Sequence, residues 1–177
     1  MSRMRREILV ALLGLLFILE GTVLPWLIPD IWQDRIGLNL VYIVILFVAI
    51  YRHRHTALIL GLVFGLLHDV IYYGSMIGPY SFSMGVSAYL LGLVLQVNRA
   101  PMPIMMTVVM LGSLLNDSIL FGIYKIFNLV GSAYDWALVQ YMIPNLFIHF
   151  VFALIIYVPL RKQLELLGRR APKEETV

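Results

Sequence analysis

The chain has 177 residues, of which 61% are hydrophobic and 13% are charged, whereas soluble domains average about 45–50% apolar and about 25% charged residues. This composition indicates a membrane protein and argues against a soluble enzyme, a disordered tail or a compact DNA-binding domain. The net charge of +3 does not indicate nucleic acid, because the Lys and Arg residues lie at the ends of apolar stretches, where they set topology against anionic lipid. The absence of cysteine removes disulfides and Cys-ligated metal sites.

Apolar stretches separated by short polar breaks predict an all-α integral membrane protein with six transmembrane helices in one bundle. At 1.5 Å per residue these stretches reach roughly 24 to 35 Å, against a hydrocarbon core of about 30 Å. The second and third are short, which predicts bilayer thinning, helix breaks or burial. No break is long enough for a soluble domain, so residues 1–177 are expected to form a single membrane domain. The predicted spans cover residues 8–28, 36–51, 56–72, 80–97, 102–124 and 138–160.

The distribution of Lys and Arg predicts the orientation of these spans. Of the 13 Lys and Arg residues, only Arg35 and Lys125 fall on one side, so both termini are expected in the cytoplasm. The outer side, which holds Arg35 and Lys125, also carries the three tryptophans. Tryptophan side chains prefer the membrane interface. The basic N-terminus imitates a signal peptide, but Glu20 follows the apolar run and no small-residue cleavage site appears. We therefore expect the first helix to be retained.

Three carboxylates lie inside the predicted spans, and they are Glu20, Asp69 and Asp117. A charged group in hydrocarbon is costly, so each is a candidate functional residue by default. All three fall in the outer half of their spans, and Asn145 lies at a comparable depth on the last span. Together they predict a polar cluster open to the outside. Two interpretations stay open: these residues cement the bundle through hydrogen bonds, or they form a proton relay, a metal site or a solute pocket.

Metal and catalytic chemistry receive little support from the sequence. His68, His149 and the carboxylates are scattered over four helices and match no metal-ligand spacing, and no His-Glu-x-x-His motif is present. No Gly-x-Ser-x-Gly motif or Ser/His pairing on one helix is present either. We therefore predict a non-enzymatic protein with no catalytic residue, no metal and no cofactor.

Small residues four positions apart predict close helix packing on the third and fourth spans. Gly61 and Gly65 form a Gly-x-x-x-Gly step, and Ala88 with Gly92 forms its small-residue analogue. Helix backbones approach closely at such positions in lipid. The pattern fits contact inside the same bundle and also the docking of a helix from another chain.

The run Gly65-Leu66-Leu67-His68-Asp69 resembles the Gly-Leu-Leu-x-Asp signature of the rod shape-determining protein MreD family. It follows a helix that opens with Gly37-Leu38-Asn39-Leu40 and precedes a small-residue helix over residues 85–92. The length, the basic N-terminus, the number of spans and the short basic tail fit the family over essentially the whole chain. The chain departs from the family by lacking a proline before Asn39 and by carrying Glu20 where Gln or another polar residue is expected.

This resemblance implies a non-enzymatic membrane scaffold of the bacterial elongation complex, located in the cytoplasmic membrane and supporting lateral peptidoglycan synthesis and cell shape. It implies MreC as a partner through its membrane helix and extracellular region, with MreB, the cell-wall synthases and membrane lipid as further partners and oligomerisation left open. The family is similar in fold to the substrate-binding subunits of energy-coupling-factor vitamin transporters, so the alternative is a small-solute-binding subunit. Those subunits typically show Ala-x-x-x-Ala on the first helix, whereas Ala11 is followed four residues later by Leu15.

Overall fold

The computed structural model describes residues 2–23, 26, 37, 39–72, 76–95 and 100–168, and in this part of the chain it is helical with no strand. The outer basic residue Arg35, residues 36 and 38 of the predicted second span and the basic tail beyond Gly168 lie outside the described residues. The helices are α1 (Ser2–Thr22), α4 (Leu40–Tyr51), α5 (Arg54–Ile71), α6 (Pro79–Val94), α7 (Met102–Ile126), the short α8 (Tyr134–Ala137), the π-helical turn η1 (Leu138–Met142) and α9 (Ile143–Gly168).

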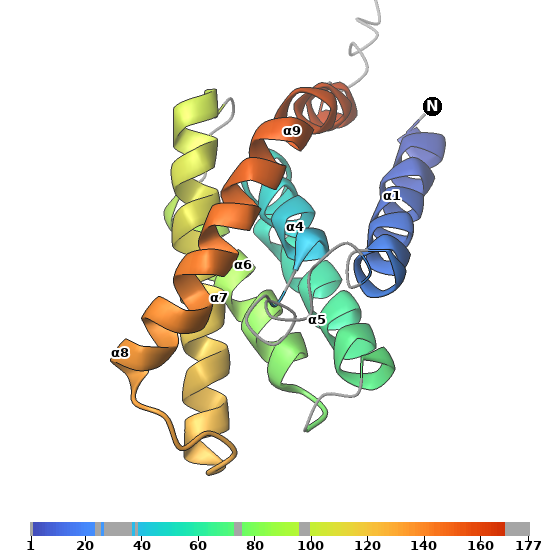
Figure 1. Cartoon of the computed structure of the whole chain (residues 1–177). Helices are drawn as coiled ribbons and strands as arrows, with labels where there is room; N and C mark the ends of the chain where they lie inside the picture. Colours follow the sequence, from blue (N-terminus) through green and yellow to red (C-terminus); the bar gives the residue numbers. More distant parts are fainter. Residues whose placement is uncertain are drawn as a thin grey trace, which may run out of the picture.

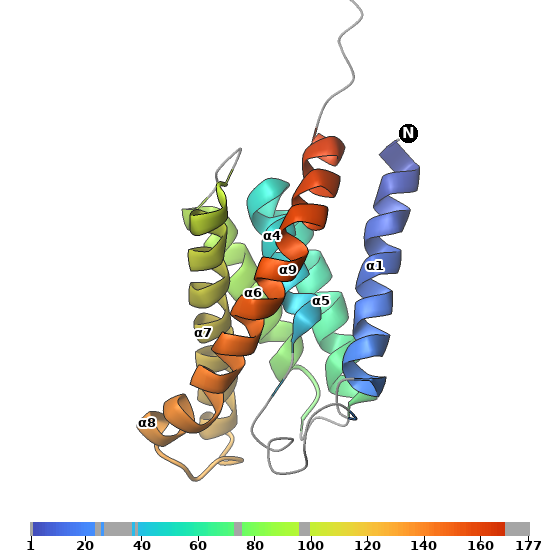
Figure 2. The ribbon, with the colours of Figure 1, turned by 45° about the horizontal axis from the view of Figure 1, so that its top comes forward.

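The long helices form one bundle around α4 (Figure 1). α4 contacts each of the other five long helices of the described chain, namely α1, α5, α6, α7 and α9. Figure 2 shows the N-terminus of α1 and the last turns of α9 at the same end of this bundle, with the connection from α7 to α8 at the opposite end. This arrangement agrees with the predicted all-α fold.

The central helix α4 is too short to cross a membrane alone. It has 12 residues, which gives a length of about 18 Å at 1.5 Å per residue. Every residue from Leu40 to Ile50 is buried, because the surrounding helices cover its whole surface. α4 thus begins inside the predicted span of 36–51. Of the outcomes predicted for a short span, the structure shows burial.

Three helical segments are long and apolar enough to cross a membrane by length and composition: Arg54–Ile71, Met102–Ile126 and Tyr134–Leu164. The last segment is continuous because α8, η1 and α9 follow one another without a break. α6 is shorter, at 16 residues. The described chain therefore contains three candidate spans that meet these criteria, which is consistent with a multi-pass membrane protein.

The small residues of α5 lie against α6 of the same chain. A Cβ atom added at Gly61 would lie 2.8 Å from the Cα of Gly85, and one added at Gly65 would lie 2.5 Å from the Cα of Ser81. The Ser81 hydroxyl also donates a hydrogen bond of 2.8 Å to the Leu62 carbonyl across this contact. The face of α5 that carries the glycine step is thus occupied by α6, and the two backbones meet directly there.

Candidate functional site

The buried start of α4 is held by a carboxylate from another helix. The first N–H groups of a helix have no acceptor within that helix. Glu20 of α1 supplies the acceptor, because its Oε2 accepts hydrogen bonds from Leu40 N–H at 3.0 Å and Val41 N–H at 3.4 Å. Its negative charge also suits the positive end of the helix dipole. Glu20, which is only 5% exposed, therefore ties α1 to the central helix.

Two side chains of α9 bind the residues just before α4. His149 Nε2 accepts a hydrogen bond of 3.2 Å from Asn39 N–H, and Asn145 Oδ1 accepts one of 2.9 Å from Gly37 N–H. Because Nε2 accepts, the proton of a neutral His149 ring lies on Nδ1. That atom is 2.9 Å from the Ser113 hydroxyl of α7. α9 is thereby joined to both α4 and α7.

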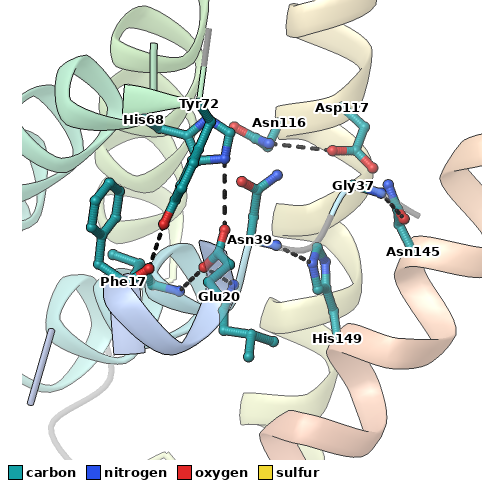
Figure 3. A network of polar contacts seen from close by, with 12 residues as sticks. Phe17, Glu20, Gly37, Asn39, His68, Tyr72, Asn116, Asp117, Asn145 and His149 are labelled. Atoms are coloured by element: carbon teal, nitrogen blue, oxygen red, sulfur yellow. Dashed lines mark hydrogen bonds and ion pairs between the residues drawn. The ribbon is translucent and has the colours of Figure 1, made fainter. Parts of the chain in front are cut away.

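His68 of α5 lies beside Glu20 and between two tyrosine rings. Its Nε2 is 3.6 Å from Glu20 Oε1, so the imidazole and the carboxylate form an ion pair when the ring is protonated. The imidazole stacks on Tyr80 at a centroid distance of 4.1 Å and meets the edge of Tyr72 at 4.8 Å. The Tyr72 hydroxyl donates a hydrogen bond to the Phe17 carbonyl. Because Tyr80 belongs to α6, this group joins α1, α5 and α6. Figure 3 shows its α1 and α5 members.

Asp69 of α5 binds the turn at which α6 begins. Its Oδ2 accepts hydrogen bonds from Gly78 N–H at 2.9 Å and Ser81 N–H at 3.2 Å, and its Oδ1 accepts one of 3.2 Å from Tyr80 N–H. Gly78 has φ 119°, a conformation that glycine adopts without steric cost. Asp69 is 2% exposed, and the carboxylate therefore supplies acceptors that the first turn of α6 lacks.

Asp117 of α7 has a different environment, because it faces a cavity of about 380 Å³. Asn116 Nδ2 donates a hydrogen bond of 3.3 Å to Asp117 Oδ1. The second oxygen, Oδ2, has no hydrogen-bond partner, and neither has Asn39 Oδ1. Both residues line the cavity together with Asn145. The walls carry five aromatic residues: Tyr80, Phe121, Tyr124, Trp136 and Tyr141.

The predicted polar residues have two kinds of surroundings. Glu20 and Asp69 bind backbone N–H groups at the starts of α4 and α6, whereas Asp117 and Asn145 line the cavity. Figure 3 places Asn39 between Glu20 on one side and Asp117 on the other. Gly61 and Gly65 belong to neither group, because they lie in the contact between α5 and α6.

Sequence reasoning did not assign a role to Asn39 or Ser113. The available signal for Asn39 was its position directly before the uninterrupted apolar run of residues 40–50, where a buried polar residue marks a helix start inside the bundle. Ser113 carried no such signal, because a lone serine in an apolar helix is common. Among the described residues, no group of three or more His, Asp or Glu residues is placed to hold a metal ion.

A sequence model of the rod shape-determining protein MreD family matches residues 5–167. The chain belongs to the MreD family. Membership implies a role in rod shape determination, and MreD proteins are generally non-enzymatic membrane proteins. No curated protein and no solved structure matches the chain. The similarity in fold to the energy-coupling-factor subunits therefore stays a prediction for this MreD-family protein.

Proposed function

We propose that this MreD-family protein is a membrane scaffold of the elongation complex that binds MreC and supports lateral peptidoglycan synthesis. The observation that carries the proposal is the family match over residues 5–167. The hydrogen bonds support it, because side chains of α1 and α9 bind the buried start of α4 and Ser113 of α7 contacts His149 of α9. A bundle that is fixed in this way presents rigid helix faces to a partner.

The proposed topology has six crossings with both termini in the cytoplasm. The asymmetry of Lys and Arg supports this orientation, and the two ends of the described chain lie at the same end of the bundle (Figure 2). The chain has no native cysteine, so single cysteines can be introduced at Ser2 and Gly131. We expect an impermeant thiol reagent to label these two positions from opposite sides of the membrane, and labelling from one side would refute the topology.

Partner binding is tested by copurification with tagged MreC, followed by cysteine crosslinking. Ile18 of α1, Val63 of α5 and Ile155 of α9 are exposed, and each reports on a different lipid-facing surface. Cysteines at these positions should crosslink unequally to a cysteine in the membrane helix of MreC, because a single helix docks on one face. A protein that restores rod shape but neither copurifies with MreC nor crosslinks at any of the three positions would overturn the proposal.

The cavity gives limited support to the alternative of a small-solute-binding subunit of an energy-coupling-factor transporter. Its volume of about 380 Å³ falls within the range of roughly 300–1,000 Å³ that is typical of ligand pockets. The first helix does not support this alternative, because Leu15 occupies the second position of the expected Ala-x-x-x-Ala step. Growth-independent uptake of a vitamin by cells that contain the chain together with a coupling subunit would favour the alternative over the scaffold.

A further inference from the structure

The cavity between α6, α7 and η1 has an oxygen-rich floor. Asp117 is 9% exposed and Asn39 is 2% exposed, and both line the cavity. One oxygen of each side chain, Asp117 Oδ2 and Asn39 Oδ1, has no hydrogen-bond donor. Asn145 lies beside Asp117 (Figure 3) and its side chain interacts with the carboxylate, although no donor meets hydrogen-bond geometry at Oδ2. A buried acceptor without a donor costs roughly 1–3 kcal/mol, and more when it is charged.

The nearby backbone cannot supply the missing donors. The N–H groups of Gly37, Asn39 and Leu40 are already bound to Asn145, His149 and Glu20. Asp117 itself lies well inside α7, where neighbouring N–H groups donate to carbonyls of their own helix. The described backbone therefore leaves both oxygens to donors that reach them from the cavity.

The charge and shape of the walls specify the kind of donor. Of the lining residues that the structure describes, Asp117 is the only one with a carboxylate, and none is Lys, Arg or His. The aromatic residues of the walls, such as Tyr124 and Trp136, have ring faces that attract cations. Aromatic rings alone accept a quaternary ammonium as well as a primary one. A quaternary ammonium has no N–H group to donate to the two oxygens, whereas a primary ammonium has three.

We propose that this cavity binds a primary ammonium group, with Asp117 and Asn39 accepting its N–H donors and the aromatic walls surrounding its charge. The group is carried by a lipid headgroup such as that of phosphatidylethanolamine or by a free amine, and these two sources share the same recognition chemistry. Ligand binding at this site goes beyond the scaffold role and does not depend on MreC.

The test is an equilibrium binding measurement on the purified full chain in detergent, with thermal stabilisation as a second readout. The probes are dihexanoyl-phosphatidylethanolamine, the choline-headed lipid with the same chains, and the free amines ethanolamine and tyramine. We expect a primary ammonium probe to bind at least about tenfold more tightly than the choline-headed lipid, since a hydrogen bond to a charged group is worth roughly 1.5–3 kcal/mol. Binding by the lipid alone identifies a headgroup site, and binding by a free amine identifies a solute site.

Two variants make the result specific to the cavity. Asp117→Asn should weaken binding of the primary ammonium probe about tenfold or more, because it removes the charge at the floor. Asp135→Asn makes the same chemical change at an exposed residue of α8 that does not line the cavity, so its affinity should equal that of the parent chain. The proposal is overturned if no probe binds, if the choline-headed lipid binds as tightly as its ethanolamine analogue, or if Asp117→Asn retains full affinity. None of these results bears on copurification with MreC, so failure of this site leaves the scaffold proposal standing.

Discussion

A buried carboxylate has different surroundings on the two sides of the bundle. Where α5 meets α6, Asp69 accepts three backbone hydrogen bonds, and Gly61 and Gly65 bring the two backbones into contact. Where α7 meets α9, Asp117 accepts one hydrogen bond from Asn116 and faces a cavity. The same residue type thus binds the N–H groups of a helix start on one side and faces a cavity on the other.

The difference follows from where helices begin. Asp69 faces the first turn of α6, where N–H groups have no acceptor within the helix. Asp117 faces the start of α4, but there Glu20, His149 and Asn145 have already taken the described backbone donors. Because these backbone donors are bound to other side chains, Asp117 Oδ2 has no donor. The surroundings, and not the residue type, decide whether it is structural.

The largest expected effect comes from filling the close contact on the α5–α6 side. Gly65→Leu would drive a side chain into the Ser81 backbone, which leaves no room for a Cβ atom. We expect a loss of about 3 kcal/mol in the free energy of unfolding, at the upper end of the usual cost of overpacking. The melting temperature in detergent and the amount of folded protein in membranes measure this loss.

Gly14→Leu is the matched control for this substitution. A Cβ atom added at Gly14 meets nothing within 4 Å, so the same change on α1 should leave the melting temperature nearly unchanged. If Gly65→Leu is as stable as Gly14→Leu, then α5 and α6 do not pack as closely as the structure shows, and the contrast between the two sides of the bundle fails.

The second largest effect is expected from removal of the Asp69 carboxylate, which binds the first turn of α6. Asp69→Ala strands three backbone N–H groups and should cost about 2–3 kcal/mol of unfolding free energy. Asp69→Asn should cost about half as much, because one amide oxygen can keep the two hydrogen bonds of Oδ2 while its NH₂ group faces the Tyr80 N–H. Rod-shape complementation with membrane levels checked should follow the same order. A proton-relay or metal role would instead make Asp69→Asn as inactive as Asp69→Ala at normal abundance.

Part of this organisation could be predicted from the sequence. Glu20, Asp69 and Asp117 stand out because charges in apolar stretches are rare and costly, and the family signature around Asp69 is local. The contacts between distant parts of the chain could not be predicted: His149 accepts a hydrogen bond from Asn39, which is 110 residues away in the sequence. The glycine step of Gly61 and Gly65 looks the same in sequence whether its neighbour is α6 or another chain, so only the structure places α6 there.

The smallest expected effect on stability is at Asp117, although this carboxylate is also buried. In the purified chain without added ligand, Asp117→Asn keeps an oxygen for the hydrogen bond from Asn116 and removes a buried charge that has one oxygen without a donor. The loss of a buried charge favours the folded state, so the unfolding free energy should stay within about 1 kcal/mol of the parent value or rise slightly. Parallel melting curves of Asp117→Asn and Asp69→Asn in the same detergent measure the contrast directly. A loss at Asp117 equal to that at Asp69 would mean that both carboxylates hold the fold together, because only a carboxylate that the fold does not use can be neutralised without cost.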